Sequence, residues 1–226
     1  MKMPKIGTLN LIDKAILENQ KPVRKRIGCS QAGEECEYKL WLGLNNQRPI
    51  DDPRVLRIFE LGNQVETVVI NLLKQAGVTV YEKDQEGKQF QVSFLDGSLQ
   101  GSIDGVVTGI PESERPHLLE IKSYNNARFN TLCKESVSKS DPKYFTQVQL
   151  YLKGLNLEKA LFIAYNKDTS DLYEERIDYD PFEAEIAINK VQKVIESKDG
   201  LNLDTTKNYK CIFCNHKDVC HAYNKN

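Results

Sequence analysis

Asp104, Glu120 and Lys122 have the residue types and the spacing that phosphodiester chemistry requires. Asp104 lies in "GSIDGVV", and the other two lie in "HLLEIKSY" further along the chain. If both segments are paired strands, Glu120 and Lys122 share one face, and Asp104 and Glu120 can converge on one cation. Carboxylates suit Mg²⁺ or Mn²⁺, which activate water and stabilise charge on phosphate. Lys122 can orient or deprotonate that water, or neutralise the transition state.

Taken alone, a Glu-x-Lys triplet in a strand is weak evidence, because most such triplets form a solvated face with a cross-strand ion pair. The surrounding sequence must therefore supply a fold. Apolar periodicity, capping residues and turn signals predict this order of elements. We expect helices at 8–19, 52–77, 126–138, 141–155 and 181–197, strands at 78–82, 89–94, 98–109 and 117–124, and a hairpin at 159–178. The order predicts one α/β domain with a mixed central sheet flanked by helices.

Composition limits the function classes without selecting one. Charged residues make up 28% of the chain, but the formal net charge is −1, so no global positive field indicates nucleic acid. An acidic active site can offset a local basic surface, so a nuclease remains compatible. Arg24, Lys25 and Arg26, in the basic run "KPVRKR", are candidate phosphate contacts. No signal peptide or bilayer-spanning stretch is visible, so we expect a cytoplasmic protein with no membrane partner.

Three cysteines near the end of the chain, Cys211, Cys214 and Cys220, have the spacing C-x2-C-x5-C. In a reducing cytoplasm such a cluster indicates metal binding or catalysis rather than disulfides. Thiolates select zinc or iron–sulfur clusters, and a four-ligand site needs one more ligand. His216 or His221 would complete a Cys3His zinc site, whereas the second close Cys pair of a zinc ribbon is missing.

The Asp104…Glu120-x-Lys122 pattern resembles the PD-(D/E)XK nuclease superfamily. Gln147 and Tyr151, four residues apart on one predicted helical face, resemble the QxxxY motif of its RecB-like branch. That branch often has a glycine in an early helix and, four residues later, a metal-binding histidine. Here Gly62 is followed at that spacing by Glu66, a departure that replaces an imidazole with a carboxylate. Glutamate can still ligate Mg²⁺ or Mn²⁺.

The resemblance implies a restriction-endonuclease-like core and a role for each matching residue. The implied metal ligands are the carboxylates of Glu66, Asp104 and Glu120 and the carbonyl of Ile121. Lys122 would support the attacking water. Gln147 would orient Lys122 or the substrate, and Tyr151 would shape the site or contact DNA. The same helix would also pack Val148, Leu150 and Leu152 into the core, which is compatible with the motif.

The cysteines are similar to those of iron–sulfur RecB-like nucleases, namely the AddB type and the CRISPR-associated adaptation nucleases with their phage relatives. In these, one N-terminal cysteine and three C-terminal ones hold a 4Fe-4S cluster that joins the termini. The ligands implied here lie within 29–36 and 211–220 of a single domain, 1–226. We favour Cys36 over Cys29, because the aromatic "CEYKLW" follows it. Cys133 and the remaining cysteine are then unligated thiols.

The resemblance implies a metal-dependent DNA exonuclease with a structural cluster, acting on single-stranded DNA from 5′ to 3′, although no residue fixes the polarity. The setting would be CRISPR spacer acquisition or phage and plasmid DNA recombination and repair, in a bacterial, archaeal or phage-infected cell. Partners would be DNA and recombination or CRISPR-integration proteins, and a homo-oligomer is compatible. The alternative is a non-catalytic DNA-binding or scaffold module with a structural iron–sulfur or zinc site.

Overall fold

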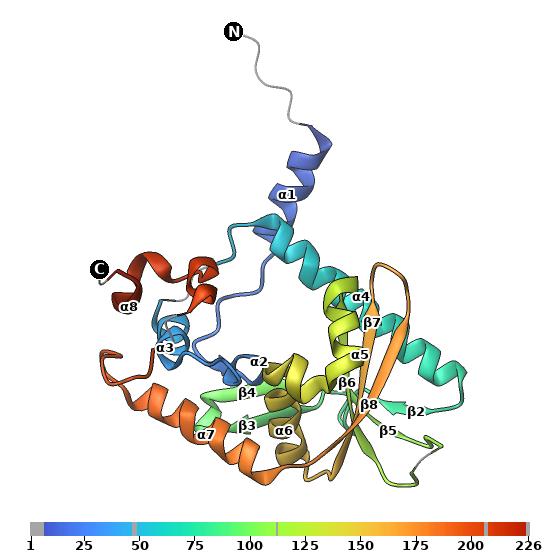
Figure 1. The fold of residues 1–226 in the computed structure, drawn as a ribbon. Coiled ribbons are helices and arrows are strands. Elements are labelled where there is room, and N and C mark those ends of the chain that lie inside the picture. The colour runs from blue at the N-terminus through green and yellow to red at the C-terminus, as the bar shows by residue number, and fades with distance from the viewer. Residues whose placement is uncertain (1–6, 47–48, 112, 206–207, 225–226) are drawn as a thin grey trace.

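The structure, a computed structural model, describes residues 7–46, 49–111, 113–205 and 208–224 (Figure 1). The α-helices are α1 Thr8–Glu18, α2 Cys29–Ala32, α3 Glu37–Asn45, α4 Pro53–Gln75, α5 Asn126–Ser140, α6 Pro142–Leu155, α7 Pro181–Glu196 and α8 His221–Asn224. The strands are β1 Ile27–Gly28, β2 Thr79–Tyr81, β3 Gln91–Phe94, β4 Leu99–Ser102, β5 Gly105–Thr108, β6 His117–Tyr124, β7 Lys159–Asn166 and β8 Leu172–Asp178. Short 3-10 turns are η1 Leu95–Gly97, η2 Tyr209–Phe213 and η3 Lys217–Val219. The predicted succession is confirmed, and β1, α2, α3, α8 and the 3-10 turns are additional.

Capping residues and a terminal glycine explain where the long helices begin and end. The Asp52 side chain accepts a hydrogen bond from the Arg54 N–H at 2.8 Å, and Pro53 occupies the first turn of α4. Asp180 caps α7 in the same way, and a cap of this kind contributes about 1 kcal/mol. Gly77, just after α4, adopts φ +87°, a conformation that glycine reaches without strain.

Two mixed sheets carry the strands. The larger has the order β2-β5-β6-β7-β8, with β6 and β7 parallel and the other neighbours antiparallel. The smaller has the order β1-β4-β3, with β1 parallel to β4. The predicted hairpins β3–β4 and β7–β8 are both confirmed. The pairing of β5 with β6, on which the convergence of the carboxylates depends, is also confirmed, with Gly105 opposite Leu119.

The prediction of one continuous strand over 98–109 in one central sheet is wrong. The strand breaks at Ile103 and Asp104, so that β4 belongs to the smaller sheet and β5 to the larger. The Ile103 N–H still bonds to the Phe90 carbonyl at 3.0 Å, which continues the pairing with β3. Asp104 instead bonds through its side chain to β6. It therefore lies at the junction of two sheets rather than at the centre of a strand.

Side chains of β6 alternate between two buried clusters. Leu119 and Ile121 belong to the cluster that includes Val65 and Val69 of α4. Leu118, on the opposite face, belongs to the cluster that includes the inward side chains of α6 and α7. Helix α4 therefore covers one face of the larger sheet and α6 covers the other (Figure 1). A fully buried Leu or Ile contributes about 1.5–3 kcal/mol, so these clusters fix the position of β6.

The C-terminal turns and α8 lie beside α3, so distant parts of the chain meet (Figure 1). Helix α3 packs on α7, and the Trp41 Nε1–H donates to the Ser197 carbonyl at 2.9 Å. The loop after α7 returns to α3, where the Asp204 N–H donates to the Glu37 carboxylate at 2.9 Å. Helix α1 projects from the body (Figure 1). Among the described residues, no helix combines the length and apolarity that a membrane span needs.

Candidate active site

The Asp104 carboxylate is fixed by the backbone of β6. Its Oδ2 accepts a hydrogen bond from the Ile121 N–H at 2.8 Å, where backbone pairing between β5 and β6 would otherwise continue. The N–H and C=O groups of one strand residue point to the same edge, so the Ile121 carbonyl also faces this junction. An acidic side chain and a carbonyl oxygen are therefore directed to one point.

Glu120 is fully buried, and its two carboxylate oxygens differ in their contacts. Oε1 accepts from the Lys122 ammonium group, whereas Oε2 is buried and has no hydrogen-bond partner among the described residues. A buried acceptor without a partner costs about 1–3 kcal/mol, and more when it is charged. A cation bound to Oε2 would offset this cost. The Lys122 side chain is 20% exposed, so the pair lies just inside the surface.

Glu66, on α4, adds a third carboxylate. Burial and the charge of Asp104 raise the pKa of Glu66 to about 7. Burial raises the pKa of Glu120 to about 8, and the charges of Asp104 and Glu66 add to the effect, although Lys122 opposes it. Burial likewise raises the pKa of Asp104. Three carboxylates that repel one another in a half-buried place are the donor set that a divalent cation stabilises.

Lys122 supplies the counter-charge in this conformation. Burial alone would lower its pKa, but Glu120 and Asp104 together raise it above its usual range. A lysine that stays protonated favours charge neutralisation over the role of a base. In the described part of the chain, no three His, Cys, Asp or Glu side chains lie close enough together to hold a metal ion. The predicted convergence of the carboxylates on one cation stays a prediction.

Gln147 and Tyr151 lie on one face of α6 and contact each other. The Gln147 Nε2–H donates to the Tyr151 hydroxyl at 2.9 Å, and the Gln147 Oε1 is buried with no hydrogen-bond partner in the described residues. Both side chains are buried. The helix face that carries the motif therefore also packs against the core. The charge of Glu120 adds to burial in raising the pKa of Tyr151, so the motif lies beside the carboxylates.

Gly101, on β4, is a residue that the sequence interpretation missed. A Cβ at this position would lie 2.4 Å from the Tyr151 Cε1 and 2.9 Å from the Cys29 Cβ. Only glycine therefore lets the phenol ring approach the strand. The sequence does contain a glycine three positions before Asp104. The reason for this glycine lies in contacts with α6 and α2, which cannot be inferred from the sequence.

Cys29 is fully buried near the carboxylates. Burial, together with the charge of Glu120, raises the pKa of its thiol to about 12. Cys36 lies elsewhere, at the start of α3, whose aromatic residues form the helix that the resemblance implies. The structure thus separates the two alternatives for the fourth cysteine, placing Cys29 in the candidate active site and Cys36 beside the C-terminal turns.

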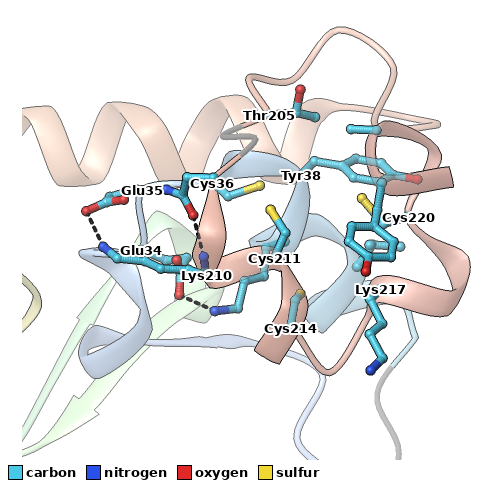
Figure 2. A pocket seen from close by; sticks show the side chains of 15 residues that line it. Glu34, Glu35, Cys36, Tyr38, Thr205, Lys210, Cys211, Cys214, Lys217 and Cys220 are labelled. Atoms are coloured by element: carbon cyan, nitrogen blue, oxygen red, sulfur yellow. Dashed lines mark hydrogen bonds and ion pairs between the residues drawn. The ribbon is translucent and has the colours of Figure 1, made fainter. Parts of the chain in front are cut away.

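Figure 2 shows a second region, the cysteine pocket, a cavity of about 50 Å³ between α3 and the C-terminal turns. The four half-buried cysteines of the predicted cluster site line it, namely Cys36, Cys211, Cys214 and Cys220. Their thiols share this cavity. Among the described residues, however, no three of these side chains lie close enough together to hold a metal ion. Cys133, on α5, is exposed and does not line the cavity.

The histidines that would complete a zinc site do not line the cysteine pocket. The His221 ring contacts the Tyr38 ring edge-on, with centroids 4.2 Å apart. His216 lies near α3, with its Nε2 3.9 Å from an ideal Cβ at Gly43. A Cys3His arrangement would need one of these rings to turn toward the thiols, whereas Cys36 already faces the cavity.

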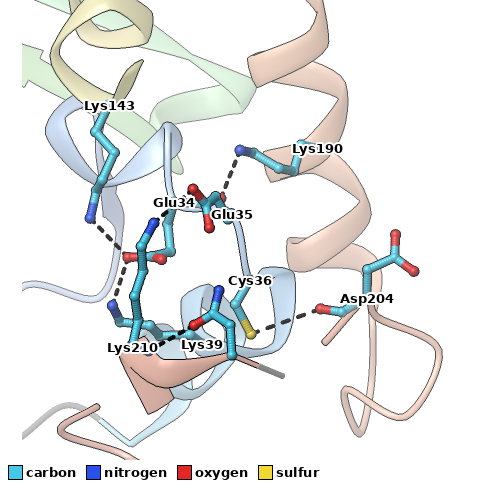
Figure 3. Close-up of polar contacts among 9 residues, drawn as sticks. Glu34, Glu35, Cys36, Lys39, Lys143, Lys190, Asp204 and Lys210 are labelled. Atoms are coloured by element: carbon cyan, nitrogen blue, oxygen red, sulfur yellow. Dashed lines mark hydrogen bonds and ion pairs between the residues drawn. The ribbon is translucent and has the colours of Figure 1, made fainter. Parts of the chain in front are cut away.

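Ion pairs tie the segment before Cys36 to its neighbours (Figure 3). The Glu34 carboxylate accepts from Lys39 at 2.7 Å and from Lys143 of α6 at 2.8 Å. Burial opposes ionisation of Glu34, but hydrogen bonds from these two lysines lower its pKa to about 2. Lys210, in the C-terminal turns, pairs with Glu35 at 2.9 Å. These ion pairs thus connect the segment before Cys36 to α6 and to the C-terminal turns.

The basic run at 21–26 is largely exposed, as expected for a solvated segment. Arg26 donates to the Gln100 side-chain carbonyl next to Gly101, which places the end of the run beside β4. Arg24 and Lys25 point away from the buried core and stay candidates for phosphate contacts.

Two proteins of known structure share this fold. The crystal structure of SSO0001 matches with a TM-score of 0.59 and 15% identity, over 96% of this chain and 98% of that chain. LHK-Exo, an alkaline exonuclease from Laribacter hongkongensis, matches with a TM-score of 0.54 and 17% identity, over 82% of this chain and 90% of its own. Its complex with dAMP matches with a TM-score of 0.55 and 17% identity, over 80% and 88%. No protein-family model and no curated protein matches the sequence. The fold is therefore a mixed α/β fold shared with an alkaline exonuclease.

Proposed function

We propose that this chain is a metal-dependent DNA exonuclease formed by a single RecB-like PD-(D/E)XK domain. The observation that carries the proposal is the buried Glu120 oxygen without a partner, beside Asp104 and Lys122, in a fold shared with an alkaline exonuclease. A decayed, non-catalytic module would have no need to keep a buried charge whose second oxygen is unsatisfied. The intact Gln147–Tyr151 pair supports the same conclusion.

The carboxylates of Glu66, Asp104 and Glu120 and the Ile121 carbonyl would hold Mg²⁺ or Mn²⁺. When bound, the ion would supply an activated water and stabilise charge on the scissile phosphate. Lys122, protonated and next to Glu120, would neutralise charge that develops on the phosphate oxygens. Gln147 would direct its amide toward Lys122 or the substrate, and Tyr151 would keep Gln147 in that position.

The finer parts of the proposal rest on the motif resemblance. Single-stranded DNA would be degraded from 5′ to 3′, in CRISPR spacer acquisition or in phage and plasmid recombination and repair. The cysteine pocket would hold a structural 4Fe-4S cluster through Cys36, Cys211, Cys214 and Cys220. Thiolates are the ligands that such clusters use, and the shared cavity supports this set of four. The cluster would supply a clasp between distant parts of the chain, and hydrolysis needs no electrons from it.

Nuclease assays on single-stranded DNA labelled at the 5′ or the 3′ end test the proposal. The anaerobically purified chain is incubated with Mn²⁺, Mg²⁺ or EDTA, and Glu120→Ala is the matched control. We expect mononucleotides released in a metal-dependent way from one end only, with no release by Glu120→Ala. Equal cleavage by Glu120→Ala would contradict the catalytic assignment. Metal-independent DNA binding without any product would favour the scaffold alternative.

Iron and sulfide analysis of the same preparation tests the cluster separately. A brown protein that absorbs near roughly 400 nm supports iron–sulfur ligation. A colourless protein with one zinc per chain would support the Cys3His alternative and would leave the nuclease proposal intact.

A further inference from the structure

A row of cations and aromatic rings begins at Lys122 and leads away from the carboxylates. The Lys122 Nζ lies 5.3 Å from the centroid of the Tyr144 ring. The Arg128 guanidinium carbon lies 5.9 Å from the same centroid and 5.0 Å from that of Tyr124. The two rings meet edge to face, with centroids 6.2 Å apart and an interplanar angle of 82°. Catalysis as proposed above uses only Lys122 from this row.

The positions of these residues make the row an extension of the candidate active site. Tyr144 lies one helical turn before Gln147 and on the same face of α6. Tyr124 follows Glu120 and Lys122 on the same face of β6. Arg128 lies in the first turn of α5, directly after β6 ends. The row therefore runs from the carboxylates to the place where α5 and α6 begin.

Exposure increases from Lys122 through Tyr144 to Arg128, whereas Tyr124 is buried. The Lys122 side chain is 20% exposed, Tyr144 is half-buried, and the Arg128 side chain is 52% exposed. A bound chain could thus contact the row from solvent and continue to Glu120. The simpler interpretation is that Arg128 only links α5 to α6 through its ion pair with Asp141. A guanidinium has five N–H donors, however, so the ion pair leaves donors that can bind a phosphate at the same time.

We propose that Tyr144 and Arg128 form a subsite for the nucleotide next to the scissile phosphate of single-stranded DNA. Tyr144 stacks on the nucleobase, and Arg128 binds the flanking phosphate. The pairing of one aromatic ring with an adjacent cation matches the two chemistries of an unpaired nucleotide, a π face and a charged phosphate. Bases in a duplex stack on each other, so the subsite selects single strands. This inference rests on the proposed nuclease function.

The test measures binding of a fluorescein-labelled single-stranded oligonucleotide by anisotropy, in EDTA, where hydrolysis does not interfere. Tyr144→Leu should weaken binding about 5- to 100-fold, which is the loss of one stacked base, whereas Tyr144→Phe should bind like the wild type. Arg128→Gln should weaken binding and reduce the slope of log Kd against log salt by about 1. The matched controls are Tyr209→Leu, in the exposed C-terminal turn, and Arg115→Gln, which also removes an arginine paired with a carboxylate.

A second measurement begins with the wild type alone, so its first result does not depend on how a variant folds. The wild type is titrated with oligonucleotides that carry one abasic site, moved along the strand. One position, close to the end that is cleaved, should weaken binding as much as Tyr144→Leu does, and in Tyr144→Leu the same abasic site should have no further effect.

The outcomes distinguish failure of the subsite proposal from failure of the nuclease proposal. If the wild type binds and cleaves DNA and Tyr144→Leu and Arg128→Gln bind as tightly as their controls, the subsite proposal is overturned and the nuclease proposal stands. If the variants weaken binding but the wild type releases no nucleotides with Mn²⁺, the subsite stands and the nuclease proposal fails. An abasic effect that is additive with Tyr144→Leu would also overturn stacking on this ring.

Discussion

The candidate active site and the cysteine pocket are held in place by different means. Glu120 lies in the middle of an eight-residue strand and is fully buried, and Gln147 lies in a 14-residue helix. The tail cysteines lie in and beside short 3-10 turns, next to exposed apolar residues such as Phe213, which is 79% exposed. Regular elements with buried faces position the first region, whereas the tail cysteines of the second region lie in or next to short, partly exposed turns.

This difference indicates what each region needs in order to work. The candidate active site is preorganised, because hydrogen bonds and core packing fix its side chains before any ligand binds. The contacts that hold the tail beside the cysteine pocket include the exposed Lys210–Glu35 ion pair, which contributes about 0–1 kcal/mol, and the ring contact of His221 with Tyr38. We therefore expect the tail to depend on what the thiols bind, and the active site to tolerate the loss of that ligand. The predictions below test this comparison.

The largest effect should come from Asp104→Asn, which keeps the hydrogen bond to Ile121 within reach but removes a charge. We expect nucleotide release with Mn²⁺ to fall at least about 100-fold, because a preorganised charged group contributes that much to a reaction at phosphate. Iron content should not change. Asp178→Asn, at an aspartate whose side chain is 77% exposed, is the control and should cleave normally. A parallel loss of iron would mean that the two regions are not independent.

The next effect should come from Cys211→Ser. We expect loss of iron and of the absorbance near roughly 400 nm, and rapid proteolysis within 208–224, because the tail loses its clasp. Cleavage of DNA per folded molecule should fall less than about tenfold, since Asp104 and Glu120 are positioned by the sheet. Cys133→Ser, at the exposed thiol on α5, is the control. Retained iron and an intact tail would show that Cys211 is not a ligand.

Gly101→Ala tests the packing behind the active site, and Gly154→Ala is its matched control. A Cβ at Gly154 would lie 2.2 Å from the Val92 Cγ1, a clash as close as that between position 101 and Tyr151. Both variants should lower the free energy of unfolding by roughly 1–3 kcal/mol in thermal or chemical denaturation. Only Gly101→Ala should also lower kcat, by about tenfold. Equal kcat values for Gly101→Ala and Gly154→Ala would show that displacing the Tyr151 ring does not affect catalysis.

The smallest effect concerns Glu66, whose pKa is raised in the folded protein to about 7. A carboxyl with a raised pKa binds more protons when folded than when unfolded, so its contribution to stability falls as the pH rises toward 7. In metal-free protein, Glu66→Gln should therefore be neutral at pH 5 and stabilising by about 1 kcal/mol at pH 8, after solvent screening. The same variant should need more Mn²⁺ for cleavage. Equal stability of variant and wild type at pH 8 would mean that burial and the charge of Asp104 do not raise the pKa of Glu66.

The sequence predicts those parts of the molecule in which local pattern and tertiary environment agree. The β6 strand matches its predicted bounds, 117–124, because Leu118, Leu119 and Ile121 supply apolar side chains to both faces of a buried strand. Gln147 and Tyr151 were found because a helix places residues four apart on one face. The capping pattern of Asp52 and Pro53 likewise fixed the start of α4.

Nonlocal features could not be predicted in the same way. The division into two sheets depends on where the chain turns at Asp104. The dipeptide Asp104-Gly105 is compatible with a turn, but it does not indicate that the strands on its two sides join different sheets. Gly101 matters only through Tyr151 and Cys29, which approach it from other elements. Cys29 and Cys36 are both N-terminal cysteines in the sequence, and only the three-dimensional arrangement places one in the candidate active site and the other in the cysteine pocket.

Direct measurement of Mn²⁺ binding by titration calorimetry tests the central claim, that the carboxylates around Glu120 hold the catalytic cation. The wild type should bind Mn²⁺ with release of protons below about pH 8, because Glu120 and Glu66 must ionise. Glu120→Gln should lose this binding, and Cys211→Ser should keep it. Unchanged Mn²⁺ binding by Glu120→Gln would contradict the account.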